Sequence, residues 1–313
     1  MSSENHPRHA GQRSQRWVLF ALLLTAALMF VFPLIWMVST TLKTEEQAAS
    51  ASLSLLPKEQ SPLAPTGATP NQPGEAPPSV LSQAVTNASD NYSAVWNDPS
   101  IEFPLYLRNT LIVALLSVVG MTLSSAVVAY GLSRIPWRGR GAVFVTVLVT
   151  MMIPFPVLMV PLYMVFRWLG WIDTLKPLWV PAWFGGAFNI FLLRQFFMGI
   201  PKELSEAARV DGAGHWTTFW RVIVPLSKPA LALVALFHFI YVWNDFLAPL
   251  IFITKPDQRT LALGLQLYQS KAGLTPWNLL MAASTMVVAP VLVLFLLTQR
   301  AFVRGIAAEG LKD

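Results

Sequence analysis

Hydrophobic residues in this chain lie in six long runs that contain no charged residue. A helix needs about 20 mostly apolar residues to cross a hydrocarbon core of ~30 Å, so such runs predict an all-α membrane protein with six transmembrane helices. The fourth and fifth runs are short and need flanking residues, 194–197 and 246–253, to reach that length. The runs extend from Trp17 to Leu42, Asn109 to Ser133, Gly141 to Phe166, Pro177 to Leu193, Pro229 to Asn244 and Ala272 to Gln299.

Composition excludes an ordinary soluble domain, because 54% of the 313 residues are hydrophobic and only 12% are charged, against about 25% charged in soluble domains. An alternative for the first run is a secretory signal peptide, since Ala49-Ser50-Ala51 resembles a cleavage site. The apolar region of a signal peptide usually has about 7–15 residues, whereas this run has 26, and the charged segment 43–46 separates it from the cleavage-like tripeptide. We therefore favour an uncleaved span.

The distribution of basic residues predicts the orientation. With six spans both termini lie on one side, and fourteen of the 22 Lys and Arg residues fall on that side, so the positive-inside rule places both termini in the cytoplasm. Topology thus explains the net charge of +6 without a nucleic-acid partner. The expected segments are a cytoplasmic tail (1–16), the first span (17–42), an external loop (43–107), a core with spans two to six (108–299) and a cytoplasmic tail (300–313).

Residues 50–90 of the external loop are rich in Pro, Ser, Ala and Asn and show almost no apolar periodicity. Such a composition cannot bury enough apolar surface to fold alone. We expect a flexible linker here, and a small recognition module is the alternative.

Residues 199–228, between spans four and five, form the most informative loop. Pro201 suits the first turn of a helix because its missing N–H needs no partner there, and Glu203 and Glu206 follow near the positive end of the helix dipole. The helix is expected to end near Val210. The segment Asp211-Gly212-Ala213-Gly214 then supplies two glycines that can adopt positive φ, which ends a helix and turns the chain.

A second helix is expected to begin near His215, with Trp216, Phe219, Trp220 and Ile223 at helical spacing. The loop is therefore predicted to be a helix-turn-helix held between two spans. One alternative is an amphipathic loop that rests in the membrane interface. Another is DNA binding by this geometry, which tethering to the bilayer at both ends disfavours.

The pattern E-A-A-x-x-D-G-A-x(9)-I-x-P, which begins at Glu206 and ends at Pro225, resembles the EAA loop of ABC importer permeases. In that family the two short helices dock in a groove of the ATPase subunit. The resemblance implies that Ala207 and Ala208 permit close helix approach, that Glu203, Glu206 and Arg209 offer charge pairs to the ATPase subunit, and that Gly212 fixes the bend. The implied coupling residues are Glu203, Glu206, Ala207, Ala208, Arg209, Asp211, Gly212, Ala213 and Gly214.

Other segments are similar to one branch, the carbohydrate-uptake permeases that resemble the smaller membrane subunit of maltose importers. Among them are AYGLSRIPWRGR at 129–140, NIFLLRQFFMGIP at 189–201 and WNDFLAPL at 243–250. The resemblance implies a type I importer fold in the bacterial inner membrane. It also implies a second permease subunit, two ATPase subunits or domains that bind ATP and Mg, an external substrate-binding protein and a sugar substrate. The tract 50–90 departs from the family because it is longer and richer in Pro.

Two features concern the transport path. Pro154, Pro156 and Pro161 interrupt the third span, which suits either a gate or packing kinks. Sugar sites combine aromatic faces with hydrogen-bonding groups, and such a set follows the fifth span. The candidate substrate-path residues are Tyr241, Trp243, Asn244 and Asp245. An acid at membrane depth indicates function, although a hydrated anchor at the interface is the alternative for Asp245.

The sequence has no P-loop, HExxH or GxSxG motif and no cysteine. We therefore expect no enzymatic activity, metal or cofactor on this chain, with ATP bound by another subunit. An ion-coupled secondary transporter is the alternative function, but it would use charges at the midplane and often an internal repeat, and neither is evident. The sequence does not distinguish among sugars, polyols and glycerol phosphates.

Overall fold

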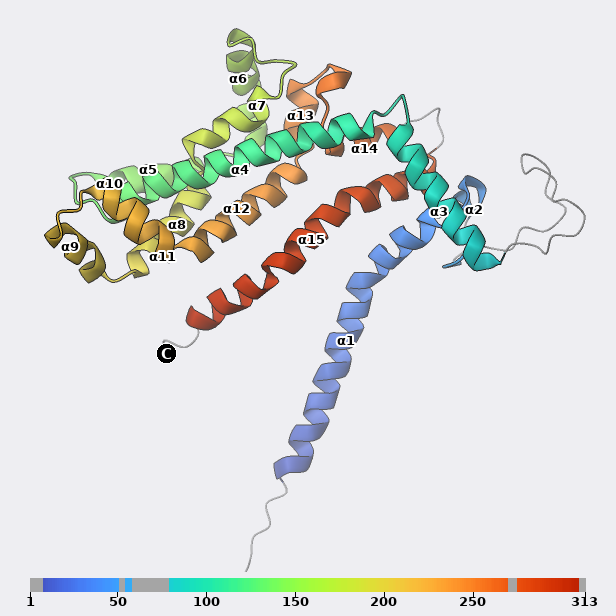
Figure 1. Ribbon diagram of the computed structural model, residues 1–313, viewed down its shortest axis with the longest axis horizontal. Coiled ribbons are helices and arrows are strands. Elements are labelled where there is room, and N and C mark those ends of the chain that lie inside the picture. Colours follow the sequence, from blue (N-terminus) through green and yellow to red (C-terminus); the bar gives the residue numbers. More distant parts are fainter. Residues whose placement is uncertain (1–7, 51–53, 58–78, 270–274, 310–313) are drawn as a thin grey trace, which may run out of the picture. The chain divides into compact units, whose positions relative to one another are not determined.

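A computed structural model of the chain describes residues 8–50, 54–57, 79–269 and 275–309, and every regular element in these ranges is helical. The elements fall into two compact units, one of residues 1–98 with 268–288 and one of residues 99–267 with 289–313. The helices, labelled in Figure 1, are α1 (Arg8–Thr41), α2 (Glu45–Ala49), α3 (Val80–Asn97), α4 (Phe103–Ser133), α5 (Arg140–Thr150), α6 (Phe155–Trp168), α7 (Lys176–Trp179), α8 (Ala187–Gly199), α9 (Lys202–Val210), α10 (His215–Thr218), α11 (Val224–Leu226), α12 (Lys228–Trp243), α13 (Leu247–Phe252), α14 (Leu261–Gln269) and α15 (Trp277–Glu309).

Three described helices, α1, α4 and α15, are long and apolar enough to cross a membrane. Two further pairs pass the same test together but are bent, α5 with α6 by 97° and the segment His215–Leu226 with α12 by 79°. By length and composition the described residues thus provide three to five spans, where the sequence predicts six.

The fourth predicted run accounts for the difference, because it is not one helix. It comprises α7, a 3₁₀ helix (Val180–Phe184) and the first half of α8. Pro177 and Pro181 are the second residues of the first two elements, and Gly185 separates the last two with a φ of +82°. Proline removes a backbone donor and a positive φ ends a right-handed helix, so the run breaks at these residues.

The proline-rich third run is also interrupted, as the sequence predicts. The α5 helix ends at Thr150, and Pro154 takes the extended N-cap position before α6. Pro156 lies in the first turn of α6, where its missing N–H is harmless, and Pro161 lies inside the helix. The sharp bend thus occurs before Pro154.

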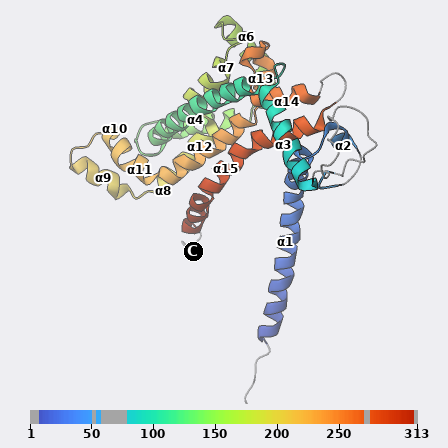
Figure 2. The same cartoon turned by 45° about the vertical axis from the view of Figure 1, so that its right-hand side comes forward.

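The core of the second unit forms around α4, with α8 and α12 packed along it, as Figures 1 and 2 show from two directions. Small residues of α4, Ala126 and Ala129, are almost fully buried there and permit close helix approach. The buried cluster consists of Ala126, Ala129, Tyr130, Leu193, Phe197, Ile200, Phe219, Ile223, Ala230 and Val234.

The other end of α4 is fixed by side-chain hydrogen bonds. The Asn109 amide donates to the backbone carbonyls of Asp257 and Arg259, both at 2.9 Å. The Thr110 hydroxyl accepts from the Leu261 N–H at 2.9 Å, where α14 begins. These buried polar side chains replace backbone partners that the turn before α14 lacks.

In the first unit the linker prediction is wrong for residues 80–90, because they belong to α3. Ser79 caps this helix, and its side chain accepts from the Ser82 N–H. Asn87 donates to the Leu42 carbonyl at 3.0 Å, so polar residues that suggested a linker instead bind the backbone after α1. Residues 51–53 and 58–78 of the tract lie outside the described residues.

Candidate functional site: the helix-turn-helix loop

The first helix of the candidate loop, α9, begins and ends where the sequence predicts. Pro201 occupies its N-cap, and the chain leaves helical geometry at Asp211. Glu203 lies in the first turn and Arg209 in the last, so both charges complement the helix dipole. Both side chains and Glu206 are exposed and form no ion pair among the described residues. These three charged groups are therefore open to other molecules.

The turn after α9 depends on Gly212, which has a φ of +82°. Its N–H donates to the Arg209 carbonyl at 3.0 Å, and the Ala213 N–H donates to the Ala208 carbonyl at 2.9 Å. These bonds satisfy carbonyls that the end of a helix leaves without partners. The expectation of positive φ at Gly214 is wrong, because Gly214 has a φ of −70° and is the extended N-cap of α10.

The second helix begins at His215, as predicted, but it is not a uniform α-helix. A π-helical turn (Phe219–Ile223) follows α10 and leads into α11. Phe219 and Ile223 are buried, at 1% and 0% exposure, whereas Trp216 is 63% exposed. The wider π-helical turn directs this face toward α4 and leaves Trp216 outside.

Tyr130 in the last turn of α4 and Arg134 directly after this helix hold the loop, and sequence reasoning assigned no role to either. The guanidinium of Arg134, which follows α4, donates to the carbonyls of Phe197 and Ile200 at the end of α8. The Tyr130 hydroxyl lies 3.4 Å from His215 Nδ1, and its ring centroid lies 5.2 Å from that of Phe219. One sequence signal indicates that a donor is needed here: Pro201 has no N–H for the Phe197 carbonyl four residues earlier.

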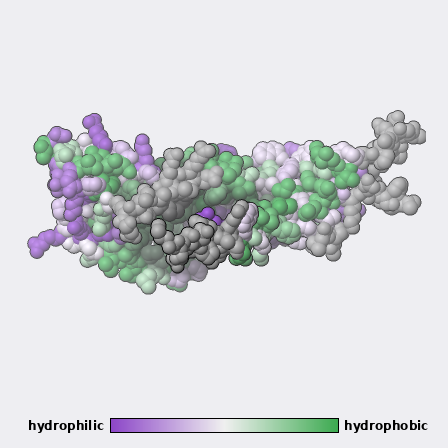
Figure 3. Space-filling view, turned by 90° about the horizontal axis from the view of Figure 1, so that it is seen from below, coloured by the Kyte–Doolittle hydropathy of each residue, from purple (hydrophilic) through white to green (hydrophobic). Residues whose placement is uncertain are grey.

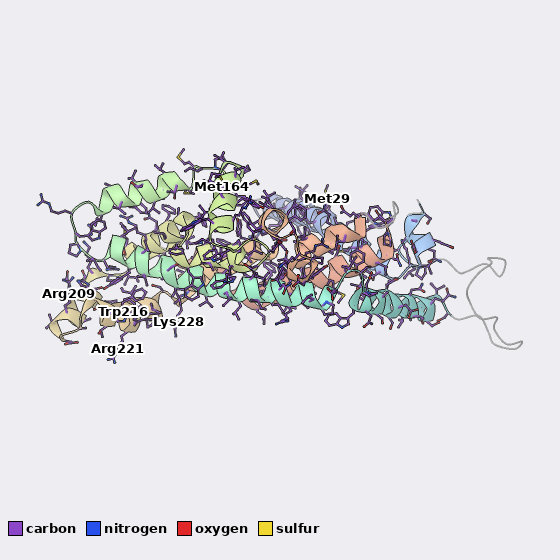
Figure 4. The ribbon with its side chains drawn as sticks, turned by 90° about the horizontal axis from the view of Figure 1, so that it is seen from above. Met29, Met164, Arg209, Trp216, Arg221 and Lys228 are labelled. Atoms are coloured by element: carbon purple, nitrogen blue, oxygen red, sulfur yellow. The ribbon has the colours of Figure 1, made fainter. Side chains whose placement is uncertain are left out.

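The exposed surface of the loop carries both charges and aromatic groups. Figure 4 places Arg209, Trp216, Arg221 and Lys228 together along the segment from α9 to α12. In Figure 3 hydrophilic residues gather at the end of the second unit where Figure 1 shows α9, beside hydrophobic surface. Val210, at the end of α9, is 88% exposed. The first helix and its turn thus project from the helical core.

The four candidate substrate-path residues do not form one exposed cluster. Tyr241 is 62% exposed on α12, and Asn244 is exposed after it, with its amide donating to the Ile240 carbonyl at 2.8 Å. Trp243 is instead 2% exposed, its ring stacked 5.1 Å from that of Phe239. The structure therefore leaves two of the four side chains open to a solute.

Asp245 caps the next helix rather than projecting freely. Its carboxylate accepts from the Ala248 N–H at 3.2 Å, and it lines a cavity of about 10 Å³ with Thr110 and Thr260. The Thr260 hydroxyl is buried and has no hydrogen-bond partner among the described residues. A cavity of this volume fits one water molecule and is too small for a sugar.

Comparison with known proteins assigns the chain to a family. Residues 118–308, more than half of the chain, match the family described as binding-protein-dependent transport system inner membrane component. This chain belongs to that family, the membrane permeases of ABC importers. It is therefore a multi-pass membrane protein of a transport system, which excludes the secondary-transporter alternative.

Individual relatives support the assignment. The chain is 37% identical over 225 residues to the trehalose/maltose transport system permease protein MalG of Thermococcus litoralis, covering 71% of this chain and 81% of the relative. It is 36% identical over 221 residues to the sn-glycerol-3-phosphate transport system permease protein UgpE of Yersinia pestis, covering 69% and 78%.

A solved structure shows the same fold. It is the crystal structure of a bacterial ABC transporter involved in the import of the acidic polysaccharide alginate, with a TM-score of 0.75 at 23% identity. The match covers 95% of this chain and 99% of that chain. The type I importer permease fold predicted from the sequence is confirmed.

Proposed function

We propose that this chain is the permease subunit of a carbohydrate importer, and that residues 199–228 couple it to an ATPase subunit in the cytoplasm. The observation that carries the coupling role is the α9 helix and its Gly212 turn, which project from the core while both ends of the loop are anchored to it. The exposed Glu203, Glu206 and Arg209 offer charges to a docking groove, and Ala207 lets another backbone approach closely.

This assignment orients the chain and defines its partners. The Arg-rich side with the loop faces the cytoplasm, so both termini are cytoplasmic and Asp173 and Lys255 are external. ATP and Mg bind the ATPase subunits, and a second permease completes the pathway. An external binding protein, as the family description implies, delivers the substrate. Closure of the ATPase pair moves α9 and switches the pathway from outward-open to inward-open.

The substrate class rests on the relatives, one of which is named for trehalose and maltose and another for sn-glycerol-3-phosphate. A carbohydrate presents many hydroxyl groups, and an exposed Tyr241 beside Asn244 supplies an aromatic face and a polar group for contact along the path. These two residues remain candidates for substrate contact. Trp243 is instead buried against Phe239, and the Asp245 carboxylate accepts from the Ala248 N–H.

The proposal is tested by purifying the chain from native membranes in mild detergent and identifying its partners by mass spectrometry. We expect an ATPase subunit and a second permease. The purified complex, reconstituted with its binding protein, should then hydrolyse ATP faster with maltose or trehalose, and sn-glycerol-3-phosphate serves as the competing ligand.

The variant Gly212→Pro tests the coupling loop in the same complex. Proline cannot adopt positive φ and removes the N–H that binds the Arg209 carbonyl, so ligand-stimulated ATP hydrolysis should be abolished while the chain still inserts into the membrane. Gly214→Ala is the matched control, since Gly214 has an ordinary φ and open space around it. Normal stimulation of the Gly212→Pro complex would contradict the coupling role.

A further inference from the structure

At the end of α8 a backbone carbonyl lacks its helical hydrogen-bond donor, and Arg134 supplies one. In a continuing helix the Phe197 carbonyl would accept from the N–H of residue 201, but residue 201 is proline and has no N–H. The Ile200 N–H donates to this carbonyl over a long distance of 3.3 Å. The Arg134 guanidinium donates to the carbonyls of both Phe197 and Ile200, and a cation at this place also complements the negative end of the α8 dipole.

These two carbonyls lie directly before the coupling helix. Phe197 and Ile200 belong to the buried cluster, and α9 begins two residues after Ile200. Arg134 therefore holds the chain at the point where it leaves the core and enters the exposed loop. Both bonds come from one terminal nitrogen, Arg134 Nη2, whose two N–H groups serve the two carbonyls.

The other arm of the loop is held by the preceding turn of α4. Tyr130 lies one helical turn before Arg134, and its hydroxyl lies 3.4 Å from His215 Nδ1. Its ring packs against Phe219, which is 1% exposed. The last turn of α4 thus contacts the loop on both sides, at the exit from α8 and at the start of α10.

Between these anchors, the turn makes few contacts with the rest of the chain. A Cβ atom added at Gly212 or Gly214 would meet nothing within 4 Å, and Val210 is 88% exposed. The position of α9 relative to the membrane helices therefore depends on its two attached ends.

The α4 helix is also built to carry displacement. It has 31 residues with proline only at its first turn, which corresponds to a continuous rod of about 46 Å. At its far end Asn109 and Thr110 are bonded to the segment 257–261. A continuous helix fixed at both ends moves as one body more readily than a kinked one.

We propose that Arg134 is the positioning residue that fixes the coupling loop to α4, so that displacement of α9 moves α4 and, through Asn109 and Thr110, the segment 257–261 at its other end. Tyr130 supports the second arm of the loop in the same way. This inference rests on the proposed function for its consequence in transport, but the attachment itself is a property of this chain alone.

The attachment can be measured without any partner. The chain has no native cysteine, so spin labels can be placed at Val210→Cys and Leu115→Cys, both exposed positions on α9 and α4. Pulsed electron paramagnetic resonance should give a narrow distance distribution in the parent chain. Arg134→Gln should broaden it, because loss of charge-assisted hydrogen bonds shifts an attached–detached equilibrium about tenfold or more.

Two further variants give the measurement its specificity. Arg134→Lys keeps the charge but replaces the planar Nη2 group with an ammonium on a shorter side chain, so it should give an intermediate width. It also serves if Arg134→Gln does not fold. Arg138→Gln removes an exposed cation nearby and should leave the distribution unchanged. An unchanged distance distribution in Arg134→Gln would overturn the proposal. If Arg134→Gln does not fold, an unchanged distribution in Arg134→Lys would do so.

The consequence for transport is measured in the reconstituted complex as maltose transported per ATP hydrolysed. Arg134→Gln should lower this ratio about tenfold while the ATPase subunit still co-purifies, which a merely unstable variant would not do. An unaltered ratio would contradict the lever role of α4. If the parent chain binds no ATPase, the proposed function fails, and the distance measurement still decides the attachment.

Discussion

Asn278 of α15 donates a hydrogen bond of 2.7 Å from its side-chain amide to the side-chain oxygen of Asn91 in α3. The Asn91 amide donates in turn to the carbonyls of Thr41 and Lys43 at 2.8 and 3.0 Å. Asn91 is only 7% exposed, so water cannot readily replace it. One buried amide thus joins three segments of the first unit and ties the end of α1 to α3 and α15.

Replacing Asn91 with Ala should destabilise the first unit by about 1–3 kcal/mol, because the carbonyls and the Asn278 amide lose buried partners. Thermal unfolding in one detergent measures the effect. Asn87→Ala is the matched control, since Asn87 is half-buried and makes one bond, to the Leu42 carbonyl. Equal shifts in melting temperature for the two variants would contradict the central role of Asn91.

Two glycines two residues apart should differ in their tolerance of alanine. Gly212→Ala introduces a side chain at a φ of +82°, which costs roughly 1–2 kcal/mol, although space around it is open. Gly214→Ala should cost little, because its φ is −70°. We expect reduced ligand-stimulated ATP hydrolysis in the first variant and parental rates in the second. A larger loss of stimulated ATP hydrolysis in Gly214→Ala than in Gly212→Ala would show that the backbone φ of these glycines does not determine the effect.

Asp173, in the loop between α6 and α7, binds the segment after α13. Its carboxylate accepts from the Thr254 N–H and hydroxyl, both at 2.6 Å, and from the Lys255 N–H at 3.1 Å. The Thr254 hydroxyl, followed by its N–H, holds the pKa of the Asp173 carboxyl below its usual value. The ionised form is thus the one that stabilises the folded loop pair.

Because this pKa is lowered on folding, the stabilisation is complete above the unfolded value of about 3.9 and is lost as pH falls through the native pKa. Asp173→Asn, which tolerates the native φ of +61°, should lower the melting temperature by a constant amount from about pH 5 to 8. The difference should vanish in stronger acid. Thr254→Val keeps both backbone donors and should lose less. A difference that does not shrink as pH falls below the unfolded value of about 3.9 would refute the assignment.

Gly264 on α14 packs directly against Tyr106. A Cβ atom there would lie 2.5 Å from the ring, and the ring is 1% exposed, so it has little room to move. Gly264→Ala should therefore destabilise the second unit by about 1–3 kcal/mol, despite the better helix propensity of alanine. Gly131→Ala on α4, where nothing lies within 4 Å, should be neutral or stabilising. Chemical denaturation of both variants checks the contrast.

The helix-turn-helix could be predicted closely because its signals are local. Pro201, Glu203 and Glu206 indicated α9, and Gly212 supplied the positive φ that ends it. The same local reasoning assigned positive φ to Gly214, which is wrong because the N-cap of α10 requires extended geometry. The π-helical turn could not be predicted, since it depends on packing of Phe219 and Ile223 against α4.

For the tract 50–90, by contrast, the sequence-based prediction failed over residues 80–90. Its composition indicated a linker, yet residues from Val80 form a helix whose Asn91 binds Asn278, 187 positions away in sequence. Composition measures how much apolar surface a segment can bury, and it does not reveal which distant backbone groups need a polar partner. Arg134 was missed for the same reason, as its acceptors are 63 and 66 residues away.

The sequence by itself determined that this is a membrane protein, that it is all-helical and where α9 begins and ends, because hydrophobicity, proline and glycine act within a few residues. Only the tertiary structure decided where the fourth run breaks, which of Tyr241, Trp243 and Asn244 stay exposed, and that the C-terminal end of α4 holds the chain before α9 and at the start of α10. These features depend on which buried hydrogen-bonding groups and side chains of distant segments meet, and no local pattern specifies that.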